Sequence, residues 1–272
     1  MERNVRLQNV CNPHSQVFFF SARGEISAPT GYGPGHEPSE EHVDGLTARP
    51  FWDVTADDMV DFFPWARQLE ANAGVIQAEF AQKMLDTNKF ASDSVWQTKV
   101  MGEGWSAVRL QRLGVWNTEN CQAFPETYNL LRSLKIPLAV RGVCFARQAP
   151  GSGVQPHSDG RNFILTSHLG LKIPPGCWIK VGKEQREWEE GKLTTLDTSF
   201  VHSTGNPSNE DRHVLIIDFW HPELTEAEKS ALEFVYDLRN KFESGAVPVR
   251  KPKSLKENEQ GLGALWKSIT GR

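Results

Sequence analysis

Short apolar runs with the patterning of β-strands fill the second half of the chain. The run 138–147 (LAVRGVCFAR) is typical of a strand and ends at a Pro/Gly turn over 149–153. Further strand-like runs follow at 162–173, 177–181, 193–196, 200–202 and 212–220. Short strands separated by Pro/Gly turns predict a mainly β fold, a jelly roll or a related barrel.

Helical periodicity appears on both sides of these strands. Within 67–85 an apolar stripe recurs at helical spacing, which indicates an amphipathic helix covering a sheet. Its members are Leu69, Ala73, Ile76, Phe80 and Met84. A shorter helix is predicted over 124–134. Thr225 and Glu228 form a capping-box pattern that opens a third helix, and Gly245 suits its end. We interpret the stripes as core packing, with a dimer interface as the alternative.

The chain is long enough for one large domain with additions at both ends. It has 272 residues, of which 39% are hydrophobic, and nine Trp. We expect an extended N-terminal arm over 1–45, a folded domain over 46–245 and a basic tail over 246–272. Disorder is the default expectation for the tail, and contact with an anionic partner is the alternative.

Charge and cysteine content limit the classes of partner and compartment. The net charge of −4 gives no indication of nucleic-acid binding. Four cysteines without CxxC pairing predict a reducing, cytoplasmic location. The sequence contains no apolar stretch long enough for an integral membrane segment, and its first twenty residues lack the core of a signal peptide. An organelle transit peptide is the alternative, and no pattern indicates the oligomeric state.

Three residues in the strand-rich half have the spacing of a metal site. His157 and Asp159 are separated by one residue, and His202 lies 43 positions beyond Asp159. Two imidazoles and one carboxylate on one face of Fe(II) leave the opposite face open, as in non-haem iron oxygenases. Strands of a barrel bring distant positions together, so the long gap is no obstacle. The alternative is that each histidine is an ordinary hydrogen-bonded residue.

The H-x-[DE] pattern occurs three times, whereas eight His and 34 acidic residues among 272 give about one occurrence by chance. His42 and Asp44 lie in a Gly- and Pro-rich stretch that is poorly suited to holding a ligand. His221 and Glu223 follow an apolar strand, where we expect a structural capping role. His157 lies among strand patterns, and this context selects it.

Several segments carry a resemblance to a known family. They are Pro156-His157, His168–Leu171 with Ile173-Pro174, Trp188–Lys192, Asp197–His202 (DTSFVH) and Asp218–Thr225 (DFWHPELT). In these segments and in their order the chain resembles the aspartyl/asparaginyl β-hydroxylases, with looser similarity at 63–65 and 96–131. The resemblance implies a double-stranded β-helix (cupin-like jelly roll) with flanking α-helices, Fe(II) as the metal, and 2-oxoglutarate and O2 as cosubstrates.

The resemblance also implies roles for single residues. His157 and His202 correspond to the iron-binding histidines, Arg212 to the residue that clamps the distal carboxylate of 2-oxoglutarate, and His168 to a contact of its other carboxylate. A planar, permanently charged guanidinium suits the clamp. Animal members have a glycine where Asp159 stands, so this chain has the complete triad, which favours hydroxylation over halogenation.

One departure concerns the hydroxyl that assists the clamp. The family's serine on the preceding strand corresponds to Ala146, so we expect Thr166 or Ser167 to assist the arginine. Asp197 and Ser199 lie close to the second histidine in sequence, and we expect them to orient its ring.

A further departure concerns the substrate. The basic residues that read an acidic side chain in animal members correspond to Cys144, Ile164 and Thr166, which are uncharged. Strand alternation places Ile164 and Thr166 on one face, and an unpaired anion buried there would be costly. Arg161 is the best candidate to bind a substrate carboxylate, whereas alternation places Arg141 on the face opposite Cys144.

These observations predict an Fe(II)/2-oxoglutarate-dependent dioxygenase that hydroxylates an unactivated C–H bond of an amino-acid-like or other small substrate. The alternatives are an oxidative cyclase or desaturase of a specialised metabolite, a peptidyl Asp/Asn β-hydroxylase, and a non-enzymatic cupin-like binder. Loss of the family's serine favours the last of these. The N-terminal arm is expected to fold over the mouth of the site.

Overall fold

A computed structural model describes residues 8–9, 18–19, 35–37, 41–86 and 104–244. The chain divides into two units, residues 1–233 and 234–272. Gly245, the basic tail over 246–272 and most of the predicted arm over 1–45 lie outside the described residues. The fold that carries the site belongs to the first unit.

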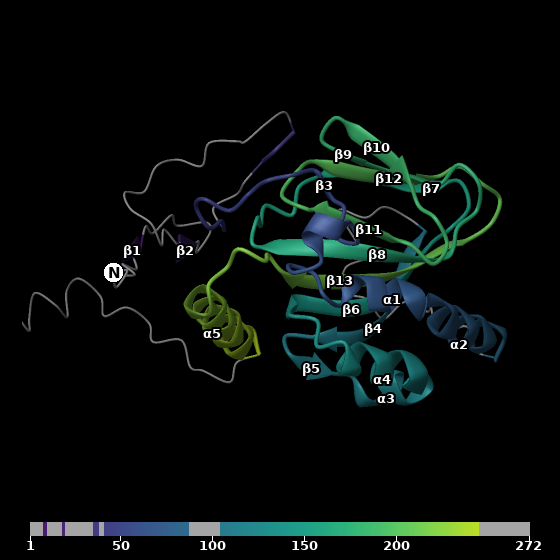
Figure 1. Ribbon diagram of the computed structural model, residues 1–272, viewed down its shortest axis with the longest axis horizontal. Helices are drawn as coiled ribbons and strands as arrows, with labels where there is room; N and C mark the ends of the chain where they lie inside the picture. Colours follow the sequence, from purple (N-terminus) through teal and green to yellow (C-terminus); the bar gives the residue numbers. More distant parts are fainter. Residues whose placement is uncertain (1–7, 10–17, 20–34, 38–40, 87–103, 245–272) are drawn as a thin grey trace, which may run out of the picture. The chain divides into compact units, whose positions relative to one another are not determined.

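Two antiparallel sheets form this fold (Figure 1). The large sheet has the order β3-β11-β8-β13-β6-β4-β5, and the small sheet has the order β10-β9-β12-β7. The strands of the large sheet are β3 (Phe51–Trp52), β4 (Trp105–Arg112), β5 (Val115–Trp116), β6 (Leu138–Gln148), β8 (Ile164–Lys172), β11 (Leu193–Asp197) and β13 (Arg212–Trp220). Those of the small sheet are β7 (Ser152–His157), β9 (Trp178–Val181), β10 (Glu184–Glu187) and β12 (His202–Asn206). A separate pair joins β1 (Gln8–Asn9) to β2 (Phe18–Phe19).

Helices cover one face of the large sheet, and the small sheet covers the other. The helices are α1 (Ala66–Ala71), α2 (Ala73–Asp86), α3 (Thr118–Ala123) and α4 (Pro125–Ser133), with a short 3₁₀ helix, η1, at Asp57–Met59. Along β13, Leu215 and Ile217 pack into the core shared with the helices, whereas Val214 packs with Ile179 of the small sheet. This alternation gives the fold two apolar layers and the predicted jelly-roll architecture, a double-stranded β-helix.

The helices confirm the main sequence patterns with one correction. The stripe predicted over 67–85 is buried except at Met84, which is partly buried, but it belongs to α1 and α2, which are separated at Asn72. The side chain of Asn72 donates from Nδ2 to the carbonyl oxygen of Gln68 at 2.8 Å, and this local contact helps to end α1. The capping box is present: the amide of Thr225 donates to Glu228 Oε2 at 2.8 Å, at the start of α5 (Glu226–Glu243).

Strand patterns confirm β6, β8, β9, β11 and β13 to within a few residues. The strand expected over 200–202 begins at His202 instead and continues to Asn206. Strands β3, β4, β5, β7 and β10 lie outside the predicted runs. Strand β7 (SGVQPH) contains Gly and Pro, and β10 (EQRE) is polar throughout, so neither carries an apolar signal.

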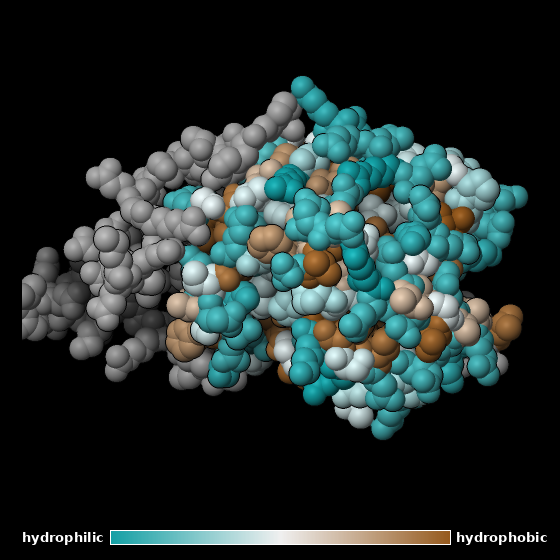
Figure 2. Space-filling model, in the orientation of Figure 1, coloured by the Kyte–Doolittle hydropathy of each residue, from teal (hydrophilic) through white to brown (hydrophobic). Residues whose placement is uncertain are grey.

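Most of the described surface in view is hydrophilic, with apolar residues in small scattered groups (Figure 2). Among the residues that the structure describes, no helix is both long enough and apolar enough to cross a membrane.

Candidate metal centre and cosubstrate site

His157, Asp159 and His202 come together in the structure, each offering one ligand atom within 4.8 Å of the others. His157 ends β7 and pairs in register with His202 at the start of β12, so the two rings lie side by side with centroids 4.2 Å apart. Asp159 follows two residues after β7, and its Oδ1 lies 4.0 Å from His157 Nε2. Within the described residues this is the one group of three or more His, Cys, Asp or Glu side chains arranged to hold a metal ion.

Backbone carbonyl oxygens fix the orientation of both rings. Nδ1 of His157 lies 2.8 Å from the carbonyl oxygen of Gln155, and Nδ1 of His202 lies 2.9 Å from that of Phe200. A carbonyl oxygen only accepts, so each Nδ1 carries the proton and each Nε2 keeps its lone pair for a metal. Burial lowers the pKa of His202, although Asp159 opposes this shift, so the ring is neutral at neutral pH.

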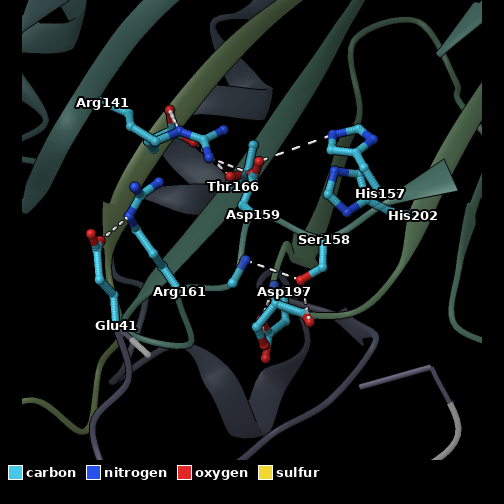
Figure 3. Close-up of polar contacts among 12 residues, drawn as sticks. Glu41, Arg141, His157, Ser158, Asp159, Arg161, Thr166, Asp197 and His202 are labelled. Atoms are coloured by element: carbon cyan, nitrogen blue, oxygen red, sulfur yellow. Dashed lines mark hydrogen bonds and ion pairs between the residues drawn. The ribbon is translucent and has the colours of Figure 1, made fainter. Parts of the chain in front are cut away.

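Asp159 is held on its other side by Arg141. Arg141 Nη1 donates to Asp159 Oδ2, and Arg141 Nε lies 3.3 Å from Asp218 Oδ2 (Figure 3). Burial alone would raise the pKa of Asp159, but Arg141 and the nearby histidines hold it well below its usual range. The carboxylate is therefore ionised, as a metal ligand must be.

The position of Arg141 corrects the prediction that it lies on the face opposite Cys144. Gly142 has a φ of +78°, and the pairing of β6 with β13 is irregular here: Ile217 faces Val143, whereas Phe219, two residues later, faces Leu138, five residues earlier on β6. A β-bulge reverses the alternation of side chains. Arg141 therefore points to the metal centre, and the pocket contains charges that strict alternation does not predict.

Arg212 begins β13 and is 2% exposed. Its Nη2 donates to Gln148 Oε1 at 2.7 Å, and its guanidinium carbon lies 4.4 Å from the ring centroid of Trp188. Its Nε and Nη1 are buried and have no hydrogen-bond partner in the structure. Burial lowers the pKa of Arg212 to about 10, so it remains a cation at neutral pH. Two buried, unsatisfied donors on a cation are suited to an anionic ligand.

His168 is the second candidate contact of the cosubstrate. Its Nδ1 accepts a hydrogen bond from Trp188 Nε1 at 3.2 Å, and the two rings stack. Burial, followed by repulsion from Arg212, lowers its pKa well below the usual value. A neutral imidazole whose Nδ1 accepts carries its proton on Nε2, which makes that atom a donor.

The other predicted pocket residues divide between the two faces of the large sheet. Thr166 pairs with Asp218 across β8 and β13, and its hydroxyl donates to Asp218 Oδ1 at 2.5 Å. Ser167 lies on the opposite face, where its hydroxyl is 2.6 Å from Thr195 Oγ1. Neither contact leads to Arg212.

Cys144 and Ile164 are both buried. Burial raises the pKa of the Cys144 thiol to about 11, so it is a neutral group beside Arg141 and Asp218. The role of Cys144 and Ile164 as substrate contacts stays a prediction.

Gln148 is a site residue that sequence reasoning missed. It ends β6, pairs in register with Arg212, and accepts from both Arg212 Nη2 and the hydroxyl of Thr204. A glutamine at a strand end carries no distinctive pattern. Its position could have identified it, because Gln148 lies two residues after Ala146 and so shares the face of the strand on which the family's serine is expected.

Arg161 and the described part of the arm meet beside the metal loop. Arg161 Nε lies 2.6 Å from Glu41 Oε2. The hydroxyl of Ser158 donates to the carbonyl oxygen of Glu37 at 3.1 Å, and the amide of Glu37 donates to Ser199 O at 3.1 Å. Residues 35–37 and 41–43 therefore lie along the loops that carry Asp159 and precede His202.

Asp197 and Ser199 do not bond to the ring of His202. Asp197 Oδ1 accepts from the amide and the hydroxyl of Ser199, at 2.9 and 2.6 Å, and His36 Nε2 lies 2.9 Å from that hydroxyl. This pair stabilises the turn before β12. The expectation that it orients the ring directly is wrong, because the carbonyl oxygen of Phe200 does so.

The other two H-x-[DE] pairs have local partners. His42 Nε2 lies 3.0 Å from Asp44 Oδ1. His221 is fully buried, lies 3.1 Å from the carbonyl oxygen of Thr47, and accepts from the amide of Glu223. The capping role expected of His221 is confirmed.

Comparison with known proteins agrees with these features. The family model "Aspartyl/Asparaginyl beta-hydroxylase" matches residues 70–222. Human aspartate beta-hydroxylase domain-containing protein 2 is 32% identical over 175 residues, covering 62% of this chain and 47% of that protein. Mouse aspartyl/asparaginyl beta-hydroxylase is 31% identical over 210 residues, covering 74% of this chain and 28% of that protein. The chain thus spans about half, or less, of these relatives.

Among solved structures, a prolyl-4-hydroxylase from Pseudomonas putida is similar with a TM-score of 0.36 and 15% identity, covering 55% of this chain and 87% of that chain. The family model spans more than half of the 272 residues and includes all three candidate metal ligands and Arg212. The chain belongs to the aspartyl/asparaginyl β-hydroxylase family.

Proposed function

We propose that this protein is an Fe(II)- and 2-oxoglutarate-dependent oxygenase that hydroxylates an unactivated C–H bond. The single observation that carries the proposal is the pairing of a three-ligand metal site with a buried arginine whose Nε and Nη1 lack partners. A buried donor without a partner costs free energy, so a fold retains one where a ligand completes it.

The donor set fits iron(II). Two neutral imidazole nitrogens and one carboxylate form the facial set used by non-haem iron oxygenases, which leaves coordination positions for the cosubstrate and O2. The bound metal would activate O2, which would oxidise both 2-oxoglutarate and the substrate: one oxygen atom would enter succinate as CO2 is released, and the other would enter the substrate C–H bond. His157, Asp159 and His202 would hold the metal.

The cosubstrate would be held by residues of the large sheet. Arg212 would bind a carboxylate through Nε and Nη1, while Gln148 and Trp188 keep the guanidinium in place. His168 would donate from Nε2 to the second carboxylate. These groups come from strands and from a packed tryptophan, so they are positioned before the ligand binds.

For the substrate we propose a small, amino-acid-like molecule. Cys144, Ile164 and Thr166 offer no charge, and Arg141 is already matched by Asp159 and Asp218. An acidic side chain entering this side of the pocket would lose hydration without a free cation. A peptidyl Asp or Asn residue is the second candidate, favoured by the names of the relatives.

The first test is an anaerobic titration of the full chain with Fe(II) and 2-oxoglutarate, following the visible charge-transfer band of the chelate. We expect a band in the wild type and none with His157→Ala. In Arg212→Ala, we expect 2-oxoglutarate to bind about 100-fold more weakly, because truncating one partner of a buried charge pair costs several kcal/mol. His221→Ala, at a buried histidine outside the site, is the control.

Absence of the band in the wild type would contradict the proposed function and favour a non-enzymatic binder. If the band forms, succinate release with free amino acids and with Asp-containing peptides separates the two substrate classes. Product mass then distinguishes hydroxylation, which adds oxygen, from desaturation or ring closure, which removes two hydrogens.

A further inference from the structure

Arg141 lies between two carboxylates beside the candidate metal ligands, and the proposed function gives it no role. Its Nη1 donates to Asp159 Oδ2, and its Nε faces Asp218 Oδ2 at 3.3 Å. The side chain of Arg141 is 24% exposed and that of Asp218 is 6% exposed. A guanidinium can make these two contacts at once because its donors form a rigid, planar fork.

Asp218 is itself fixed from behind. Its Oδ1 accepts from the hydroxyl of Thr166 at 2.5 Å, so that the carboxylate is held through both oxygens. A series of polar contacts therefore runs from Thr166 on β8 through Asp218 on β13 and Arg141 on β6 to the loop that carries Asp159. Three strands of the large sheet thus position one oxygen of one candidate ligand.

The backbone of β6 has an unusual conformation at Gly142, the residue after Arg141. Gly142 has a φ of +78°, and a Cβ at this position would lie 2.2 Å from the carbonyl oxygen of Gln111. Only glycine fits this close approach of two strands in a left-handed conformation. Gly142 lies in the stretch of β6 that breaks the regular pairing with β13, and the arginine that precedes it contacts Asp159.

A carboxylate offers a metal two equivalent oxygens and several rotamers. Arg141 occupies Oδ2, and this leaves Oδ1 on the side of His157, 4.0 Å from its Nε2. Hydrogen bonds of this kind, made by neighbours of a metal ligand, typically change metal affinity by about 10- to 100-fold.

We propose that Arg141 is a positioning residue for the metal centre: it holds Oδ2 of Asp159 so that the carboxylate meets the metal through Oδ1. The inference rests on the proposed function, since it takes the three-residue cluster to be a metal site. It also gives Arg141 a different task from the substrate-reading cations of animal relatives, because two carboxylates already match its charge.

The test is an anaerobic titration of the full chain with Co(II), whose visible absorption reports binding and coordination without turnover. We expect Arg141→Met to weaken Co(II) binding by about 10- to 100-fold. Arg147→Met is the matched control: Arg147 lies on the same strand with a similar side-chain exposure of 29%, and its Nε contacts Asp211 Oδ2 at 2.9 Å instead. We expect no change in this control.

A double-mutant cycle separates positioning from a general effect of charge. Asp159→Gly removes the ligand, and in that background Arg141→Met should not weaken Co(II) binding further. Wild-type affinity in the Arg141→Met variant, or an equal loss with and without Asp159, would overturn the inference. Failure of the wild type to bind Co(II) would instead contradict the proposed function.

Two carboxylates without their cation destabilise the fold, so circular dichroism accompanies each titration. If Arg141→Met does not fold, Arg141→Lys takes its place, because it keeps the charge and loses the fork. We expect an affinity between those of the wild type and Asp159→Gly. Wild-type affinity and an unchanged Co(II) spectrum in Arg141→Lys would overturn the assignment of the fork.

Discussion

Arg212 on β13 and Arg141 on β6 belong to the same barrel but differ in what surrounds them. Arg212 is 2% exposed, touches Gln148 and Trp188, and has two donors without partners. Arg141 is more exposed, yet two carboxylates match its charge. The difference teaches that an unsatisfied buried cation indicates a ligand site, whereas a satisfied one indicates that the protein is arranging its own groups.

The largest effect is expected from the glycine that directs Arg141. Gly142→Ala should lower the free energy of unfolding by roughly 3 to 5 kcal/mol, because the added Cβ meets the backbone of Gln111. Gly114→Ala is the control, since Gly114 has a similar φ of +75° but nothing within 4 Å of its Cβ position. It should cost about 1 kcal/mol. Equal losses in urea unfolding would show that the close approach is unimportant.

The same substitution at the two arginines should change the free energy of unfolding differently. Without cosubstrate, Arg141→Met should lower the free energy of unfolding by roughly 3 kcal/mol, because Asp218 stays buried without its cation. Arg212→Met should leave stability unchanged or raise it, since it removes two unsatisfied buried donors. Denaturant unfolding measures both. A similar loss in the two variants would break the distinction between them.

A buried carboxyl group extends the comparison. Asp197 Oδ2 has no partner in the structure, and burial raises the pKa of Asp197 from 3.8 to about 7. A raised pKa favours the protonated folded form, so its stabilising contribution is complete below about pH 4 and is lost as the pH rises through 7. Asp197→Asn removes this titration and should be roughly 2 to 4 kcal/mol more favourable, relative to wild type, at pH 8 than at pH 4. A constant difference across this range, measured by urea unfolding, would contradict the assignment.

The smallest effect on stability and on Co(II) affinity is expected at Thr166, which contacts Asp218 and so reaches Arg141 only indirectly. Thr166→Val removes the hydroxyl that donates to Asp218 and should cost about 1 kcal/mol of stability, with a loss of a few-fold in Co(II) affinity. Ser167→Ala, on the opposite face of the same strand, removes a hydrogen bond to Thr195 and should leave Co(II) affinity unchanged. If both variants weaken Co(II) binding alike, the chain of contacts does not end at the metal.

The sequence predicts those parts of the fold whose apolar residues form a continuous run or recur at a regular spacing. Strands β8 and β13 were found because their buried residues form long, continuous runs. Strand β7 was missed, although it ends at His157, because its Gly and Pro give no strand signal. The single helix predicted over 67–85 is two helices because Asn72 competes locally for backbone groups.

In the site, too, some residues can be identified from the sequence pattern, whereas others depend on the three-dimensional structure. Spacing and resemblance brought His157, Asp159, His202 and Arg212 forward, and the structure groups the first three. Strand alternation places Arg141 on the wrong face because a period of two cannot reveal the irregular stretch of β6, which shows only in its pairing with the distant strand β13.

The backbone hydrogen bonds at His157 and His202 have a consequence for how this centre can change. Each ring is oriented by a carbonyl oxygen two residues earlier in the chain, which every amino acid supplies. Substitutions around the histidines therefore leave their proton arrangement intact, provided that the strands keep their course. The position of Asp159 is then open to replacement during evolution, and a two-histidine centre is one substitution step away from a three-ligand centre on the same scaffold.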